Sequence, residues 1–201
     1  MKRLLLPFCL FFSEACTLTP MDRLDDGYDA FYETADSRLY ARLAKKGQQP
    51  HTLVISCADS RVVPEMIFNA QPGELFVLRN IGGLTGPDAV QAGIEYALNT
   101  LNIRNIILLS HQDCGAVKAL KEKEQLPPSL KKWLADESPT PGDEKDAVFA
   151  HAVRQYEKAL RIPSIQQAAL DENFRITPMV FDIRTHSLKV YNPQKKVWKK
   201  K

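Results

Sequence analysis

The feature that most constrains the fold is the alternation of short apolar runs with segments of helical periodicity. Three runs read Thr52-Leu-Val-Ile-Ser-Cys57, Glu74-Leu-Phe-Val-Leu78 and Asn105-Ile-Ile-Leu-Leu-Ser110, and further strands are expected over 176–183 and 187–191. Continuous apolar runs of this length are typical of strands buried on both faces of a parallel sheet. The alternation therefore predicts an α/β domain, a mostly parallel central β-sheet flanked by helices.

Helices are expected between these runs and before the first of them. From Met21 to Leu43 apolar side chains recur at helical spacing, which predicts one amphipathic amino-terminal helical arm ending near Gly47. The other predicted helices span 62–70, 86–101, 114–124, 147–161 and 163–170, with a polar, proline-bearing loop at 135–146. The chain thus divides into an upstream segment, a single domain and a basic tail, at 1–20, 21–192 and 193–201.

The first residues have two interpretations. Residues 1–16, MKRLLLPFCLFFSEAC, have the basic start and apolar run of a short signal peptide, with Ser13-Glu14-Ala15 as the cleavage site. Pro7 and Glu14 are unusual in such a peptide, and the alternative is an upstream extension before a true start at Met21. We therefore expect a cytoplasmic protein, with export as the alternative.

Charge and hydropathy argue against two classes of protein. Five of the lysines lie in residues 195–201, and removing their charges from the net +3 leaves −2 for the rest of the chain. A slightly acidic body does not favour nucleic-acid binding. No stretch reaches the roughly 18 to 20 apolar residues of a membrane span, so no integral membrane segment is expected.

Polar clusters follow the first three predicted strands at the point where each strand ends. They read Cys57-Ala-Asp59-Ser-Arg61, Arg79-Asn80-Ile-Gly82-Gly83 and His111-Gln-Asp-Cys114-Gly115. Ligands of open parallel sheets bind beyond the carboxyl ends of the strands. These clusters are therefore expected to form one site.

Two thiols and one imidazole from these clusters suit a metal. Cys57, His111 and Cys114 together offer a ligand set that Zn²⁺ accepts, and three protein ligands leave the fourth tetrahedral position open for catalysis. Asp59 could be a fourth ligand, or Arg61 could hold its carboxylate in a charge-assisted pair. The structural alternatives are a packing role for Cys57 and a plain salt bridge for Asp59 and Arg61.

The remaining histidines, cysteines and tryptophans lack a comparable pattern. The histidines outside the clusters are expected on the surface or in loops, the first two cysteines are expected to be inert, and the tryptophans are expected to pack or lie at the surface. These residues are His51, His151, His186, Cys9, Cys16, Trp133 and Trp198.

The motifs CADSRVVPE, PGELFVLRNIGG and SHQDCGAVKAL, within residues 21–191, resemble those of the β-class carbonic anhydrases. The resemblance implies a zinc-dependent lyase that interconverts CO₂ and bicarbonate by attack of zinc-bound hydroxide, with one Zn²⁺ per chain. It assigns the ligands to Cys57, His111 and Cys114 and the catalytic pair to Asp59 and Arg61. It also implies a homodimer or a multiple of dimers, in which the amino-terminal arm wraps around a neighbouring subunit.

The resemblance leaves alternative activities open. Relatives with the same ligands hydrolyse carbonyl sulfide or carbon disulfide, and a non-catalytic zinc-binding module would keep the ligands without needing the Asp59–Arg61 pair. A thiol-redox protein would place its cysteines close together, whereas Cys57 and Cys114 are 57 positions apart. The motif histidine is preceded by Ser110 where the family usually has glycine.

A second bicarbonate site, which some members of the family have, is not expected in this chain. In those members the site is formed by a tryptophan three residues before the first cysteine ligand and an arginine just after the second strand. Arg79 matches the arginine, but Val54 stands at the tryptophan position and has no indole N–H to offer an anion. We therefore expect Arg79 to be structural and Asp59 to be paired with Arg61.

Overall fold

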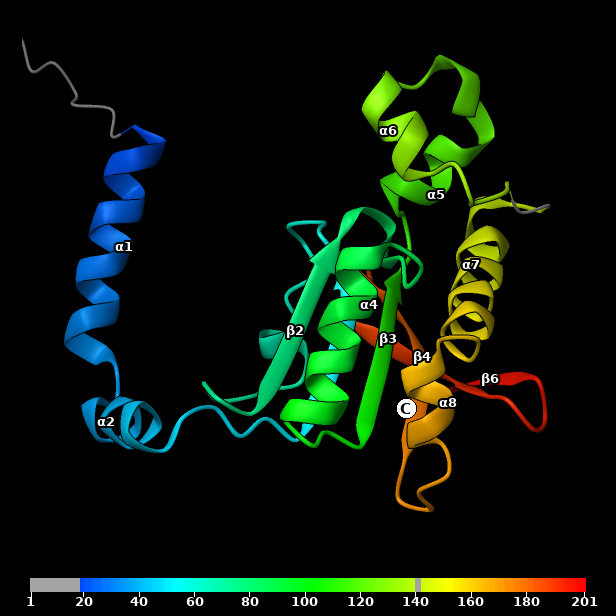
Figure 1. Ribbon diagram of the computed structural model, residues 1–201. Coiled ribbons are helices and arrows are strands. Elements are labelled where there is room, and N and C mark those ends of the chain that lie inside the picture. Colours follow the sequence, from blue (N-terminus) through cyan, green and yellow to red (C-terminus); the bar gives the residue numbers. More distant parts are fainter. Residues whose placement is uncertain (1–18, 140–141) are drawn as a thin grey trace, which may run out of the picture. The chain divides into compact units, whose positions relative to one another are not determined.

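The computed structural model describes residues 19–139 and 142–201, apart from the side chains of 122–124. The chain divides into two compact units, the first ending at Lys46 and the second running from Gly47 to Lys201. The second unit contains a central sheet with its covering helices, and the first contains two helices (Figure 1). The residues proposed as a signal peptide, together with Cys9 and Cys16, lie outside the described part of the chain.

A six-stranded sheet forms the centre of the second unit, in the order β2-β1-β3-β4-β5-β6. The first four strands in that order are parallel, and β5 and β6 are added antiparallel. The strands span Thr52–Cys57 (β1), Leu75–Asn80 (β2), Asn105–His111 (β3), Arg175–Asp182 (β4), Ser187–Asn192 (β5) and Val197–Lys200 (β6). The predicted α/β architecture is confirmed, and each of the five apolar runs forms a strand.

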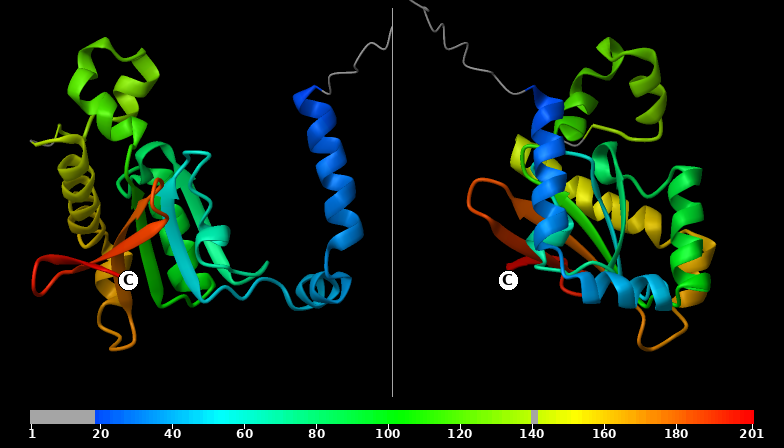
Figure 2. Two further views of the ribbon diagram at one scale, coloured as in Figure 1. Left: turned by 180° about the vertical axis from the view of Figure 1, so that it is seen from behind. Right: turned by 90° about the vertical axis from the view of Figure 1, so that its left-hand side faces the viewer.

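Helices cover the sheet because alternate strand residues point to opposite faces. Leu53 and Ile55 pack into a core cluster with Ile94 of α4 and Ile165 of α8. On the other face Val54 belongs to a separate cluster, against which Ile67 of α3 packs. The ribbon views show α3 and α4 on opposite faces of the sheet (Figure 2). The helices of this unit span Pro64–Ile67 (α3), Asp88–Glu95 (α4), Gly115–Ala119 (α5), Pro128–Trp133 (α6), Glu144–Ala159 (α7) and Pro163–Ala168 (α8).

Two of these helices end in a different geometry from the one predicted. The helix expected over 86–101 continues past α4 as a π-helical turn, and the one expected over 114–124 continues past α5 as a 3₁₀ helix. Helix α6 lies in a segment for which sequence analysis predicts no element. Its proline at the first helical position is suited to starting a helix, since that position needs no amide donor.

The basic tail contains a strand, β6, where sequence analysis predicts no element. β6 pairs antiparallel with β5, so its backbone groups are bound in the sheet. Trp198 packs between Phe149 and Tyr191, with ring centroids 4.9 Å and 5.1 Å away. One packed aromatic side chain among exposed lysines suits an edge strand, because exposed lysines discourage pairing with other chains.

The first unit contains two helices where one was predicted. α1 spans Pro20–Thr34 and α2 spans Ser37–Lys46. The chain turns out of helical geometry at Ala35, whose ψ is 138°, and the Asp36 carboxylate then accepts hydrogen bonds from the amides of Arg38 and Leu39. An aspartate that caps orphan amides in this way starts a new helix, which explains the break.

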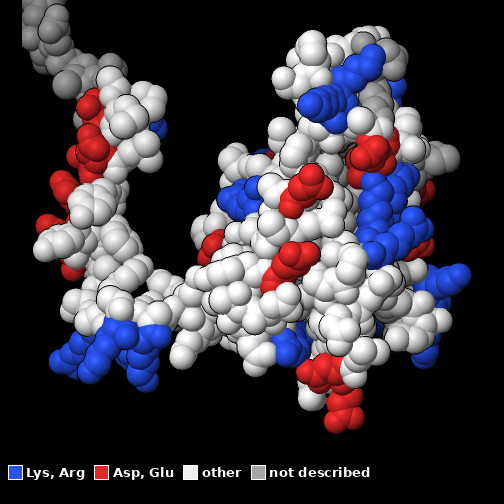
Figure 3. Space-filling view, viewed as in Figure 1, with Lys and Arg blue, Asp and Glu red and all other residues white. Residues whose placement is uncertain are grey.

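Helix α1 is amphipathic, with no buried residue in this unit. The large apolar side chains Leu24, Tyr28, Phe31 and Tyr32 are exposed. Acidic side chains line another side of the same helix (Figure 3). Among the described residues, no helix is long and apolar enough to cross a membrane.

Candidate metal centre and active site

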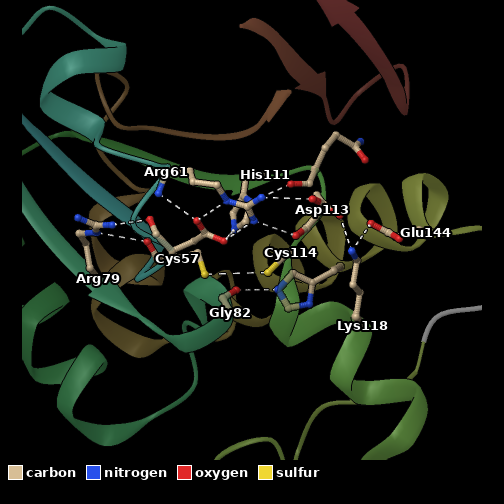
Figure 4. Close-up of polar contacts among 12 residues, drawn as sticks. Cys57, Arg61, Arg79, Gly82, His111, Asp113, Cys114, Lys118 and Glu144 are labelled. Atoms are coloured by element: carbon tan, nitrogen blue, oxygen red, sulfur yellow. Dashed lines mark hydrogen bonds and ion pairs between the residues drawn. The ribbon is translucent and has the colours of Figure 1, made fainter. Parts of the chain in front are cut away.

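The three predicted ligands meet at the carboxyl end of the sheet. Cys57 ends β1, His111 ends β3, and Cys114 immediately precedes α5. Because β1 and β3 are neighbouring parallel strands, their carboxyl ends lie at the same edge of the sheet. The two Sγ atoms lie 4.0 Å apart, and they and a His111 ring nitrogen all lie within 4.8 Å of one another (Figure 4). All three residues are buried.

The ring of His111 is oriented as a metal ligand requires. Its Nδ1 donates to the carbonyl of Gln112 at 2.9 Å, so Nε2 carries the free lone pair. The side chain is 0% exposed, and Nε2 has no hydrogen-bond partner among the described residues. Burying a polar atom without a partner costs folding free energy, and a bound metal ion would remove this cost for Nε2.

The two thiols also fit a cation between them. A hydrogen bond from Cys114 lowers the pKa of Cys57 to about 4. Burial acts in the opposite direction, and His111 contributes to the lowering. The same contact raises the pKa of Cys114, because a second thiolate beside the first would be repelled. Without a cation, therefore, only one of the two ionises readily. A divalent ion removes the repulsion, and two thiolates with one imidazole are a ligand set typical of zinc.

The loop after β2 closes tightly over Cys57. Gly82 and Gly83 have φ of +85° and +62°, and a Cβ at Gly83 would lie 3.2 Å from the amide nitrogen of Cys57. Arg79 donates to the backbone carbonyls of Cys57 at 3.3 Å and Asp59 at 2.8 Å. This explains the Arg-Asn-Ile-Gly-Gly segment, since only glycine fits this close approach and arginine holds the ligand-bearing backbone.

Asp59 and Arg61 form the pair that one of the two sequence interpretations predicts. Oδ1 of Asp59 accepts from Arg61 Nε at 2.9 Å, and Oδ2 accepts from Nη2 at 2.7 Å. These bonds hold the pKa of Asp59 far below its usual range. The carboxylate remains close to the ligands, because Oδ2 lies 3.9 Å from His111 Nε2. The structure therefore shows Asp59 bound to Arg61 beside the candidate metal centre.

Asp113 is a site residue that sequence analysis quoted within its motif without giving it a role. Its Oδ2 accepts from Arg61 Nη1 at 3.2 Å, and its Oδ1 contacts the Lys118 ammonium. Lys118 also pairs with Glu144 at 3.1 Å. The pKa of Asp113 lies well below its usual range. Hydrogen bonding with Lys118 makes the largest contribution to this lowering, and Glu144 and Arg61 make smaller ones. A carboxylate placed between two predicted ligands is the sequence signal for this contact.

His151 is buried, which corrects its predicted surface position. The side chain lies on the inward side of α7 and its Nε2 donates to the Gly82 carbonyl at 2.9 Å. The periodicity of buried α7 residues, which include Val148 and Ala152, is the signal that could have revealed it. His51 and His186 are exposed, as expected.

The tryptophans and Val54 occupy structural positions. Trp133 donates its indole N–H to the carbonyl of Ile81 at 2.9 Å, next to the tight loop. Val54 is 0% exposed inside the sheet. Together with the backbone contacts of Arg79, these positions agree with the expected structural role of Arg79.

Two surface depressions flank Arg61. One, of about 650 Å³, is lined by polar residues that include Asp113, Glu144 and Asp182. The other, of about 400 Å³, is lined mainly by the apolar side chains Val63, Met66, Ile67, Phe181 and Leu188. The guanidinium thus lies where the buried metal centre approaches the molecular surface.

Comparison with known proteins identifies the family of the chain. The carbonic anhydrase family profile matches residues 52–188, more than half of the chain. The chain is 33% identical over 183 residues to a carbonic anhydrase of Pseudomonas aeruginosa, covering 80% of this chain and 82% of that protein.

Solved structures give the same result. The β-carbonic anhydrase CcaA has a TM-score of 0.81 and 28% identity, over 90% of this chain and 92% of that chain. A tetrameric β-carbonic anhydrase of Sordaria macrospora has a TM-score of 0.71 and 26% identity, over 84% and 93%. The apo form of a carbon disulfide hydrolase has a TM-score of 0.51 and 22% identity, over 82% and 89%, which shows a shared fold alone. The chain therefore belongs to the carbonic anhydrase family and, by its likeness to these solved structures, to the β class.

Proposed function

We propose that this carbonic anhydrase hydrates CO₂ reversibly to bicarbonate and a proton with one Zn²⁺ per chain, held by Cys57, His111 and Cys114. The observation that carries the proposal is the convergence of two buried thiols and a partnerless imidazole nitrogen within 4.8 Å of one another. The intact Asp59–Arg61 pair beside them supports a catalytic role rather than a purely structural zinc site.

The donor set favours zinc over harder cations. Thiolate sulfur is a soft ligand and imidazole suits zinc, whereas Mg²⁺ and Ca²⁺ prefer carboxylate, carbonyl and water oxygens. When bound, zinc supplies Lewis-acid chemistry that lowers the pKa of water towards about 7. Three protein ligands, rather than the four of a structural zinc site, would suit a catalytic zinc.

Asp59 orients the nucleophile in this proposal. Its low pKa keeps it an acceptor across the physiological range, so the attacking oxygen donates a hydrogen bond to it and presents a lone pair to the carbon of CO₂. Arg61 fixes the carboxylate through two parallel hydrogen bonds. A new C–O bond gives bicarbonate, and the proton of the water passes to solvent buffer.

The surroundings of Arg61 suit a small, uncharged substrate. The depression lined by Val63, Met66 and Ile67 presents mainly apolar surface next to the guanidinium. CO₂ has no charge and is better accommodated by such a surface than bicarbonate is. This apolar surface would therefore hold the bicarbonate product only weakly.

We also propose that the protein acts as a homodimer or a multiple of dimers. Helix α1 exposes Leu24, Tyr28, Phe31 and Tyr32, more apolar surface than an isolated helix needs. A second copy of the chain would cover this side of the helix and supply part of the wall around the CO₂ site. The S. macrospora relative is itself tetrameric.

The cytoplasm is the compartment we propose. Cys57 and Cys114 are free thiols with Sγ atoms 4.0 Å apart, and they must remain reduced to bind a metal. A reducing compartment keeps such a pair as thiols, whereas an oxidising one favours disulfides.

Initial rates on one zinc-quantified sample test the activity and its alternative. We expect stopped-flow measurements to show rapid CO₂ hydration, while carbon disulfide and carbonyl sulfide release sulfide far more slowly. Preferential hydrolysis of either sulfur compound would show that this compound, and not CO₂, is the substrate. Inactivity towards all three, with zinc bound, would instead indicate a non-catalytic zinc-binding module.

A further inference from the structure

The guanidinium of Arg61 is held from two sides. Nε and Nη2 bind the two oxygens of Asp59, while Nη1 binds Oδ2 of Asp113 at 3.2 Å. Nη2 also donates to the backbone carbonyl of Asp113 at 3.3 Å. Arg61 therefore bridges two carboxylates from different loops, one following β1 and the other following β3 (Figure 4). The bidentate bond aligns the guanidinium and the Asp59 carboxylate with each other, and the contacts on the far side of the guanidinium tie this pair to the loop after β3.

Asp113 is well placed to fix that far side. It lies in the short loop between His111 and Cys114, so its position is tied to the backbone that carries two of the three ligands. Its φ of +62° is a left-handed conformation that Asp and Asn adopt more readily than most residues.

The second oxygen of Asp113 is occupied as well. Oδ1 contacts the Lys118 ammonium, and Lys118 in turn contacts Glu144 at the start of α7. The carboxylate thus has a fixed cation on each of its oxygens. A carboxylate restrained at both oxygens is a better anchor for Arg61 than one free to rotate.

We propose that Asp113 is a positioning residue that, together with Lys118, aligns Arg61 and through it the carboxylate of Asp59. This inference rests on the proposed CO₂ hydration, in which Asp59 orients the nucleophile. Among the described residues, the Asp113 side chain bonds to Arg61 and Lys118 and not to Asp59 or the candidate metal ligands. Its effect on catalysis is exerted through Arg61.

A merely stabilising role would give a different result. The side chains of Arg61 and Asp113 are 45% and 30% exposed, and ion pairs this exposed contribute little to folding stability. Loss of the Asp113 charge should therefore leave the melting temperature almost unchanged. Precise alignment of a catalytic carboxylate, in contrast, is sensitive to small displacements.

The test uses the zinc-loaded, full-length protein and Asp113→Asn. Asparagine keeps the size of the side chain and tolerates the left-handed backbone, so the variant removes the charge and one of the two acceptor oxygens without changing the shape. We expect bound zinc to be unchanged and kcat/KM for CO₂ to fall about 10-fold, as is usual when an outer partner of a metal site is lost. The matched control is Asp171→Asn, which breaks an ion pair with Arg104 at the other end of β3 and should leave kcat/KM unchanged.

A double-mutant cycle separates positioning from structure. If Asp113 acts through Arg61 and Asp59, Asp113→Asn should cause no further loss of kcat/KM in an Asp59→Asn background. Independent structural damage would instead multiply the two losses.

A second readout does not depend on activity. Rotation about the Nε–Cζ bond of Arg61, followed by ¹⁵N exchange NMR and assigned through Arg61→Lys, should be about 10-fold faster in Asp113→Asn because a charged hydrogen bond is lost. The same rate should be unchanged in Asp171→Asn.

Either of two results would overturn the proposal: losses that multiply in the cycle, or an Arg61 rotation rate that Asp113→Asn does not change. If the wild-type protein hydrates no CO₂, the proposed function fails, and the rotation rate alone decides whether Asp113 holds Arg61.

Discussion

Oδ2 of Asp59 lies 3.9 Å from Nε2 of His111. The first atom belongs to a carboxylate fixed by Arg61, and the second is the buried nitrogen that accepts no hydrogen bond from any described residue. This proximity joins an acceptor of known orientation to the place where a metal would be bound. It is the geometric reason for assigning Asp59 to the reaction rather than to the surface.

Asp59→Asn should keep zinc and lose most CO₂ hydration, by about 100-fold in kcat/KM. The amide has the size of the carboxylate but cannot hold Arg61 by charge, and it accepts a hydrogen bond more weakly. Stopped-flow rates and metal analysis on the same sample measure the two effects separately. Asp171→Asn removes a remote carboxylate and serves as the control. Wild-type kcat/KM in Asp59→Asn above pH 8 would remove Asp59 from the mechanism.

Cys57→Ser and Cys114→Ser should each lose zinc. A serine hydroxyl ionises poorly and is a harder ligand than a thiolate. Zinc affinity should therefore fall by at least about 100-fold, because loss of a residue that only orients a metal ligand can already cost about that much. Competition with a chromophoric chelator gives the affinity. Cys16→Ser, outside the predicted ligand set, should bind zinc as the wild type does. Full retention of zinc by both ligand variants would refute the ligand assignment.

His151 should make the protein less stable in mild acid. Burial lowers the pKa of the His151 ring, and the opposing effects of the Gly82 carbonyl and the Glu137 charge are smaller, so the folded chain keeps this ring neutral to a lower pH than the unfolded chain does. Below its ordinary pKa of about 6.5 the unfolded chain binds a proton that the folded chain does not, and stability therefore falls as the pH falls.

Urea unfolding at pH 8 and pH 5.5 measures this effect. His151→Gln, whose amide can still donate to the Gly82 carbonyl, should show a smaller loss of unfolding free energy between the two pH values than the wild type. His151→Ala leaves that carbonyl without its donor and should be destabilised by about 1 to 3 kcal/mol at both. An equal pH response in the wild type and His151→Gln would show that another group is responsible.

Bicarbonate should inhibit only as a product at the active site. The Arg79 side chain donates to the backbone carbonyls of Cys57 and Asp59, and Val54 is fully buried without an anion-binding group. Inhibition kinetics at several CO₂ concentrations test this expectation. Strong non-competitive inhibition by bicarbonate would reveal a second anion site that these two residues do not explain.

The strands and the convergence of the three candidate ligands could be predicted because both depend on local patterns. Buried parallel strands require continuous apolar runs, and the polar residues that follow β1 and β3 must lie at the same edge of the sheet. The positions of Cys57, His111 and Cys114 follow from these two facts. The Asp59–Arg61 pair follows from proximity in the sequence.

The other features depend on contacts that periodicity does not describe. The break between α1 and α2 comes from the capping carboxylate of Asp36, in the middle of a continuous apolar spacing. β6 depends on pairing with β5 and on aromatic packing of Trp198. The Arg61–Asp113 bond joins residues 52 positions apart. The first is a local capping contact inside a stretch of helical periodicity. The other two are tertiary contacts between separate segments of the chain.

Zinc removal and replacement test the central claim most directly. The protein is stripped with a chelator, zinc is added back in steps, and CO₂ hydration is measured at each step by stopped flow. The account predicts no activity in the stripped protein and a linear recovery that saturates at about one zinc per chain, with no recovery in Cys57→Ser. Hydration by the stripped protein, or equal recovery in Cys57→Ser, would contradict it.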